Sequence, residues 1–107
     1  MSKDKEIREI ERIKSSLEYH FERYRDYKYD AKNSSKKDDR NRASENMCIE
    51  AKLIEKELLN PLVLREIYNG NPYQFEDFWK YVDSDLPGYL SKIDSLLEKL
   101  KSEKEAE

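Results

Sequence analysis

The stretch IERIKSSLEYHFERYRDYKYDAK, residues 10–32, decides the fold because its apolar and aromatic residues recur at alternating steps of three and four. This spacing is the heptad seam of a coiled coil, and it is sustained for about three heptads. The seam consists of Ile10, Ile13, Leu17, His20, Tyr24, Tyr27 and Ala31, with Ile7 and Phe21 widening it on one flank. The pattern predicts a helix over residues 4–32, about 43 Å long at 1.5 Å per residue.

A polar segment, KNSSKKDD at residues 32–39, interrupts this periodicity. Ser35 and Asp38 have the spacing of a capping box, in which a hydroxyl and a carboxylate bond the free amides of a helix start. The segment therefore predicts a turn and a second helix over residues 36–59, antiparallel to the first. That helix has a seam and further apolar residues beside it, so we expect it to lie between neighbours: Met47, Cys48, Ile49, Ala51, Leu53, Ile54, Leu58 and Leu59.

Two Asn-Pro pairs mark further helix starts, since asparagine caps a helix and proline fits its first position. The pairs at residues 60–61 and 71–72 predict a short helix over 61–68 and another over 72–82. Ser84 or Asp85 is expected to cap a last helix over residues 85–102, followed by a frayed tail at 103–107. The sequence thus predicts a single all-α domain, a long antiparallel helical hairpin with three shorter helices packed at its base.

The composition excludes several classes of protein. Of the 107 residues 42% are charged, the net charge is −3, and only two glycines and three prolines occur. No apolar run approaches the roughly 18–20 residues that cross a bilayer, and the start MSKDKEIREI lacks the apolar core of a secretory signal. We therefore expect a cytoplasmic protein without a membrane segment. A lone cysteine, Cys48, leaves no intrachain disulfide and no cysteine-based zinc site.

The unique His20 and the unique Cys48 are the candidates for catalysis. A turn centred near residue 34 predicts that they lie opposite one another, and a histidine beside a cysteine can activate the thiolate. Both positions lie on or beside apolar seams, however, and no glycine-rich turn or oxyanion donor accompanies them. No ligand spacing indicates a metal site and no motif indicates a cofactor. A Cys/His enzyme is therefore the third hypothesis, and we expect no enzymatic activity.

Basic residues gather at the predicted hairpin tip. Residues 23–42 hold eight basic and four acidic side chains, whereas the remainder of the chain is net acidic. Basic side chains near tyrosines suit phosphates and stacked bases, so the alternative function is a nucleic-acid-associated factor. The interleaved acids and the acidic chain as a whole oppose this interpretation. The candidate contacts are Lys36, Lys37, Arg40 and Arg42.

Length points to a protein interface at the same tip. The last predicted helix reaches about 26 Å from the base and the hairpin about 43 Å, so we expect the tip tyrosines to lack a covering helix. Tyrosine is favoured at interfaces for its rigid area and polar end. The alternative, that the two hairpin helices bury these tyrosines against each other, stays open. The candidate contacts are Arg23, Tyr24, Tyr27, Lys28 and Tyr29.

The sequence therefore favours a small non-enzymatic interaction module, an adaptor, inhibitor or immunity-type protein. Its expected partner is another protein or a second copy of the chain.

Overall fold

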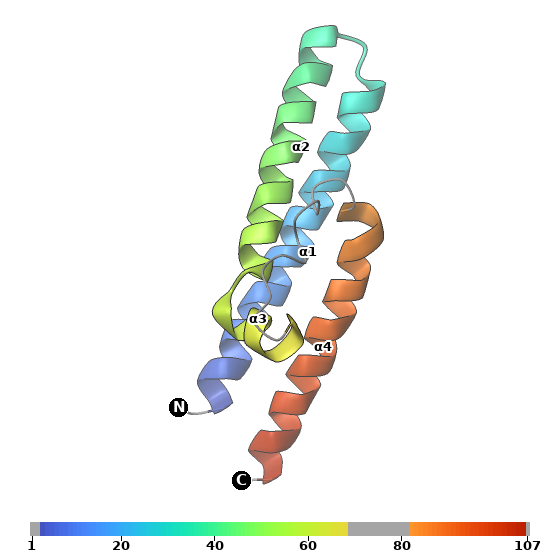
Figure 1. The fold of residues 1–107 in the computed structure, drawn as a ribbon. Helices are drawn as coiled ribbons and strands as arrows, with labels where there is room; N and C mark the ends of the chain where they lie inside the picture. Colours follow the sequence, from blue (N-terminus) through green and yellow to red (C-terminus); the bar gives the residue numbers. More distant parts are fainter. Residues whose placement is uncertain (1–2, 69–81, 107) are drawn as a thin grey trace.

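The computed structural model describes residues 3–68 and 82–106, and all regular structure within those ranges is helical. The helices are α1 (Lys3–Asn33), α2 (Lys37–Leu58), α3 (Pro61–Tyr68) and α4 (Val82–Ala106). Figure 1 shows α1 and α2 side by side as an antiparallel hairpin, with α4 along α1 and α3 near the base. The all-α hairpin bundle predicted from the heptad seam is confirmed.

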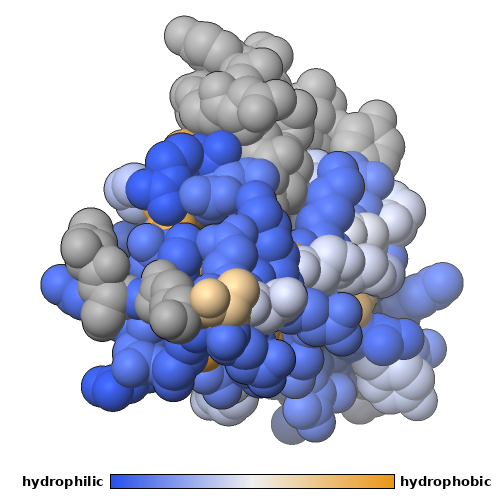
Figure 2. Space-filling view, turned by 90° about the horizontal axis from the view of Figure 1, so that it is seen from below, coloured by the Kyte–Doolittle hydropathy of each residue, from blue (hydrophilic) through white to orange (hydrophobic). Residues whose placement is uncertain are grey.

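The chain is elongated, with principal extents of 58 × 24 × 20 Å. Its radius of gyration is 16.1 Å, against about 13 Å for a compact domain of this length. The core runs along the bundle and takes residues from all four helices: Ile10, Ile13, Leu17, Ile54, Leu58, Val63, Leu86, Ile93 and Leu100 are at most 2% exposed. Figure 2, from the end where α1 begins, shows mainly hydrophilic side chains among the coloured residues.

The hairpin turn is held differently from the capping box that the sequence suggested. Lys36 occupies the N-cap of α2 with extended backbone and no side-chain cap, because the first helical bond runs from the Arg40 amide to the Lys36 carbonyl. Ser35 thus lies one residue too early to cap. The Arg40 guanidinium instead donates to the carbonyls of Ser34 and Ser35 at 2.9 and 3.3 Å. The capping-box prediction is wrong, although the turn between Asn33 and Lys37 lies within the polar segment 32–39 as predicted.

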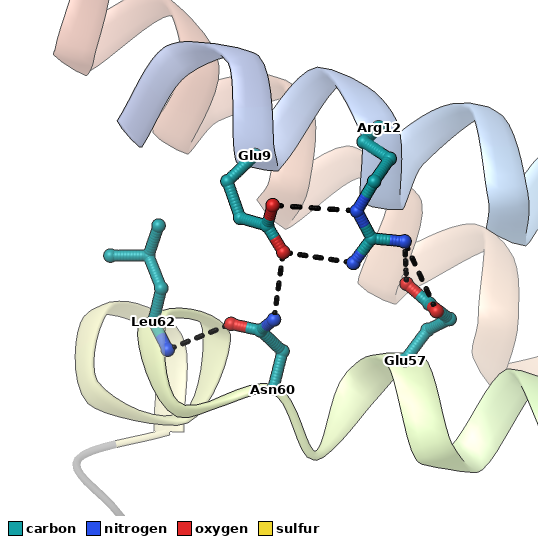
Figure 3. A network of polar contacts seen from close by, with 5 residues as sticks. All are labelled: Glu9, Arg12, Glu57, Asn60 and Leu62. Atoms are coloured by element: carbon teal, nitrogen blue, oxygen red, sulfur yellow. Dashed lines mark hydrogen bonds and ion pairs between the residues drawn. The ribbon is translucent and has the colours of Figure 1, made fainter. Parts of the chain in front are cut away.

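The start of α3 follows the predicted Asn-Pro rule. The Leu62 amide donates to Oδ1 of Asn60 at 2.9 Å, and Nδ2 of Asn60 donates to Glu9 at 3.1 Å (Figure 3). Glu9 also accepts from Arg12 at 2.8 Å, and Arg12 reaches Glu57 of α2 at 3.3 Å. The Arg12 bond lowers the pKa of the Glu9 carboxyl below its ordinary value. One polar network thus joins α1, α2 and α3 at the base.

Helix α4 is longer than predicted at both ends, and this changes what covers the hairpin. Its 25 residues span about 37 Å, and it passes through Ser84 and Asp85 rather than starting there. Val82 and Leu86 are fully buried, so apolar packing holds the first turns despite Pro87 within the helix. The predicted helix over residues 72–82 lies outside the described residues, except that Val82 belongs to α4.

The predicted fraying from residue 103 is also wrong. Glu103 lies 2.6 Å from Nζ of Lys3, and Lys104 pairs with Asp4, so two ion pairs attach the end of α4 to the start of α1. Within residues 3–68 and 82–106, no helix combines the length and the apolar character that crossing a membrane requires.

Candidate interaction surface

A buried carboxylate lies between the two hairpin helices. Glu50 of α2 is 5% exposed; its Oε1 accepts a hydrogen bond from Nε of Arg23 at 2.9 Å. Its Oε2 lies 2.5 Å from Nδ1 of His20, which is one turn before Arg23 on α1. Glutamate is almost never buried unless it is paired, because desolvating a lone charge is costly. Both oxygens of Glu50 are engaged, and the bond to Oε1 fixes Arg23 against α2.

Arg23 in turn lies between two tyrosines. Its guanidinium carbon is 5.6 Å from the ring centre of Tyr19 and 5.3 Å from that of Tyr27, within the range of cation–π attraction. Nη2 donates to the Tyr27 hydroxyl at 2.6 Å. The hydrogen bond to Glu50 is the main cause that raises the pKa of Arg23. Residues four apart share a helix face, so Tyr19, Arg23 and Tyr27 form one ordered stripe along α1.

Exposed aliphatic residues lie beside this stripe on α2. Ile49 and Leu53 are 54% and 37% exposed, and Tyr19 is 57% exposed. Leu53 lies one turn from Glu50, the residue that accepts the Arg23 hydrogen bond. We call Tyr19, Arg23, Tyr27, Ile49 and Leu53 the Arg23 surface. It combines aromatic, aliphatic and arginine side chains, the composition enriched at protein interfaces.

The tyrosines named from the sequence do not share one environment. Tyr24 is only 5% exposed, and burial raises the pKa of its hydroxyl. The prediction that its part of the hairpin lacks a cover is wrong, because α4 extends far enough to place Asp83 beside Lys28. Lys28 pairs with Asp83, and this hydrogen bond raises the pKa of Lys28. Tyr29 is 68% exposed, and Tyr27 belongs to the Arg23 surface.

Lys28 and Tyr29 instead line a cleft between α1 and the start of α4. Its volume is about 570 Å³, and its lining includes Phe21, Arg25, Lys28, Tyr29, Lys32 and Asp83. The Arg25 guanidinium stacks on the Phe21 ring at 5.4 Å. Three basic side chains against one acidic one give this cleft a positive lining. The five predicted partner contacts therefore separate: Arg23 and Tyr27 lie on one surface, Lys28 and Tyr29 in the cleft, and Tyr24 in the core.

The predicted nucleic-acid contacts are at the tip, in two different roles. Lys36, Lys37 and Arg42 are exposed. Arg40 is partly buried and bonds the carbonyls at the end of α1, so it holds the turn.

The predicted meeting of His20 and Cys48 is wrong. Opposed residues have numbers that sum to about 70, as His20 with Glu50 and Arg12 with Glu57 show, which is two more than the assumed turn implied. This small shift of register replaces Cys48 by Glu50, and Cys48 is exposed. Within the described part of the chain, no group of three histidine, cysteine or acidic residues is arranged to hold a metal ion.

Three residues of the Arg23 surface were not predicted from the sequence. Tyr19, Ile49 and Leu53 are outside the predicted contacts. The expectation that α2 lies between neighbours is wrong for Ile49 and Leu53, which are exposed. A usable signal was present: Ile49 and Leu53 are four apart and lie off the seam formed by Met47, Ala51, Ile54 and Leu58.

Comparison with protein-family models, with curated proteins and with solved structures gave no match to this chain.

Proposed function

We propose that this protein is a non-enzymatic, cytoplasmic interaction module that binds a protein partner through the Arg23 surface of its helical hairpin. Adaptors, inhibitors and immunity-type proteins act in this way. The observation that carries the proposal is the Arg23 guanidinium, fixed by the buried Glu50 between Tyr19 and Tyr27 at the edge of an exposed apolar face.

Preorganisation is the physical reason for choosing this surface. Ordering a flexible side chain at an interface costs about 0.5–1.5 kcal/mol. Here the hydrogen bonds to Glu50 and Tyr27 already order Arg23 in the free protein. A partner that covers the surface therefore gains the contact area of an arginine and two tyrosines with little further loss of entropy.

Affinity capture with matched baits tests the proposal. We expect Arg23→Ala and Leu53→Lys baits to lose a protein that the wild-type bait retains. Arg25→Ala is the control, because it removes an arginine from α1 whose stacking partner is Phe21. Circular dichroism confirms that each bait is folded. The proposal fails if the Arg23→Ala and Leu53→Lys baits capture every protein that the wild type captures.

A second candidate function has its own observation, the positive cleft between α1 and α4. Arg25, Lys28 and Lys32 line it together with the exposed ring of Tyr29, and single-stranded nucleic acids bind to such combinations of cations and stacking platforms. The exposed Lys36, Lys37 and Arg42 extend the positive charge toward the tip.

Fluorescence anisotropy with a labelled single-stranded oligonucleotide, at low and at moderate salt, tests this candidate. We expect Arg25→Ala with Lys32→Ala to weaken binding and to reduce its salt dependence. Lys36→Ala, Lys37→Ala and Arg42→Ala are combined in a second variant, which keeps Arg40 so that the turn stays intact. Equal binding by the wild type and both variants removes the nucleic-acid function.

A further inference from the structure

The Arg23 surface occupies the face of the hairpin that points away from α4. Helix α4 contacts α1 through the Lys14–Asp94 and Lys28–Asp83 ion pairs. At 3.6 residues per turn, Lys14 lies about 140° around α1 from Tyr19. Among the residues that the structure describes, four large apolar or aromatic side chains are exposed. Three of them are on this face: Tyr19, Ile49 and Leu53.

We infer that this face binds a second copy of the chain, with a two-fold axis parallel to the helices and both tips at the same end. The inference rests on the proposed function, because it names the partner of the same surface. In this arrangement α1 of each copy lies on α2 of the other, and two hairpins form a four-helix core.

The positions of the residues along the hairpin axis, which we call their levels, fit this arrangement. Because opposed positions sum to about 70, Ile49 lies level with residue 21 of α1 and Leu53 with residue 17. Tyr19 falls between these two levels. A two-fold axis along the helices keeps each level unchanged and exchanges α1 with α2. Tyr19 of one copy is therefore brought against the Ile49–Leu53 pair of the other, and the same contact occurs twice.

The charged edges of the face are complementary in the same arrangement. The outer edge of α1 carries the exposed acidic residues Glu22, Asp26 and Asp30, with the exposed Arg12 on the same side nearer the base, so it is net acidic. The outer edge of α2 carries three exposed basic residues, Arg42, Lys52 and Lys56, and two exposed acidic ones, Asp38 and Glu45. Exchanging the helices places the acidic edge of each copy on the net basic edge of the other. With the copies antiparallel, by contrast, α1 faces α1 and acidic edges meet.

The size of the face is sufficient for a specific dimer. The 22 residues of α2 extend about 33 Å, and two packed helices are about 20 Å wide. The face therefore projects about 660 Å² per copy, close to the roughly 800 Å² that each partner of a standard interface buries. Arg23 lies within this face, and its bond to Glu50 pairs its charge there. The dimer therefore does not bury an unpaired cation.

Sedimentation equilibrium of the full chain, across a wide range of concentrations, tests the inference. We expect the mass to rise from 12.9 kDa toward twice that value. Leu53→Lys places a charge in the apolar centre and should weaken association at least tenfold. The control Ser95→Lys adds the same charge at an exposed position on α4 and should leave association unchanged.

Charge exchange tests the relative orientation of the copies. Glu22→Lys and Lys52→Glu should each weaken the dimer, and the variant with both changes should recover most of the affinity. A fluorophore pair at the tip, attached through Ser35→Cys in a Cys48→Ser background, should show strong energy transfer on mixing. Dimers without transfer overturn the parallel arrangement.

A mass of 12.9 kDa at every concentration overturns self-association altogether. The proposed function is judged separately, since a monomer whose Arg23 surface still captures a different protein retains that function. If the chain stays a monomer and its Arg23 surface captures no other protein, both proposals are wrong.

Discussion

The bond between Arg23 and the buried Glu50 makes a quantitative prediction. Its two atoms are 2.9 Å apart, the Glu50 side chain is 6% exposed and the Arg23 side chain is 41% exposed. A buried hydrogen bond to a charged group contributes about 1.5–3 kcal/mol, whereas an exposed ion pair contributes about 0.2–1 kcal/mol. This pair lies between those cases because solvent screens the arginine. We expect a coupling free energy of about 1 kcal/mol.

A double-mutant cycle of Arg23→Ala, Glu50→Ala and the combined variant measures that coupling. Glu50→Ala also removes the contact with His20, so we expect it to lower the free energy of unfolding by about 2 kcal/mol. The combined variant should lose about 1 kcal/mol less than the sum of the two single losses. Urea unfolding followed by circular dichroism provides the four free energies, at a concentration low enough that association does not contribute.

A matched cycle with Arg25→Ala in place of Arg23→Ala is the control. Arg25 stacks on Phe21, so its loss should add to that of Glu50→Ala within about 0.5 kcal/mol. If the Arg23 and Glu50 losses are equally additive, Glu50 does not hold Arg23. The preorganised surface then loses its physical basis.

Three further predictions concern stability. Gly88→Ala should raise the free energy of unfolding by about 0.5–1 kcal/mol, because the added Cβ meets no atom within 4 Å in a helix; a lower urea midpoint contradicts this. Tyr24→Ala should lower it by about 3 kcal/mol or more as a core truncation, whereas a loss below 1 kcal/mol in urea unfolding indicates an exposed ring. The lowered pKa of Glu9 means that its bond to Arg12 stabilises the fold above the unfolded value of about 4.3 and is lost as pH falls through the folded pKa. The urea midpoint should therefore fall more steeply on acidification for the wild type than for Glu9→Gln, and parallel curves refute the assignment.

The heptad seam was sufficient to predict the hairpin. Ile10, Ile13 and Leu17 are fully buried as their spacing required, and the Asn60 cap is where the Asn-Pro rule placed it. These are local patterns, in which neighbours along the chain decide the outcome. The start of the last helix, by contrast, depends on contacts with residues that are distant in the sequence. Ser84 or Asp85 as a cap indicated a start near 85, yet the burial of Val82 and the pair between Asp83 and Lys28 continue the helix upstream.

Part of the candidate site was predicted from the sequence. The rest was missed because the assumed register of α2 against α1 was wrong. A turn assumed one residue earlier than the real centre shifts every opposed pair by two positions. That shift put Cys48, rather than Glu50, beside His20. A glutamate within a helix rich in charged residues has no sequence feature that marks it as buried. Arg23 and Tyr27 were named from the sequence, but the bond of Arg23 to Glu50 across the hairpin follows from the fold alone.

The position of Glu50 bears directly on what the hairpin does. Replacing a buried ion pair by apolar residues of similar volume is often neutral or stabilising, so a charge at this junction is not the most stable way to join two helices. Its specific effect is on the outer face, where it fixes the guanidinium of Arg23 between Tyr19 and Tyr27. An apolar replacement at position 50 would therefore keep the hairpin and release Arg23. Such a variant, Glu50→Leu, separates stability from recognition: it should fold at least as well as Glu50→Ala and yet bind partners as weakly as Arg23→Ala.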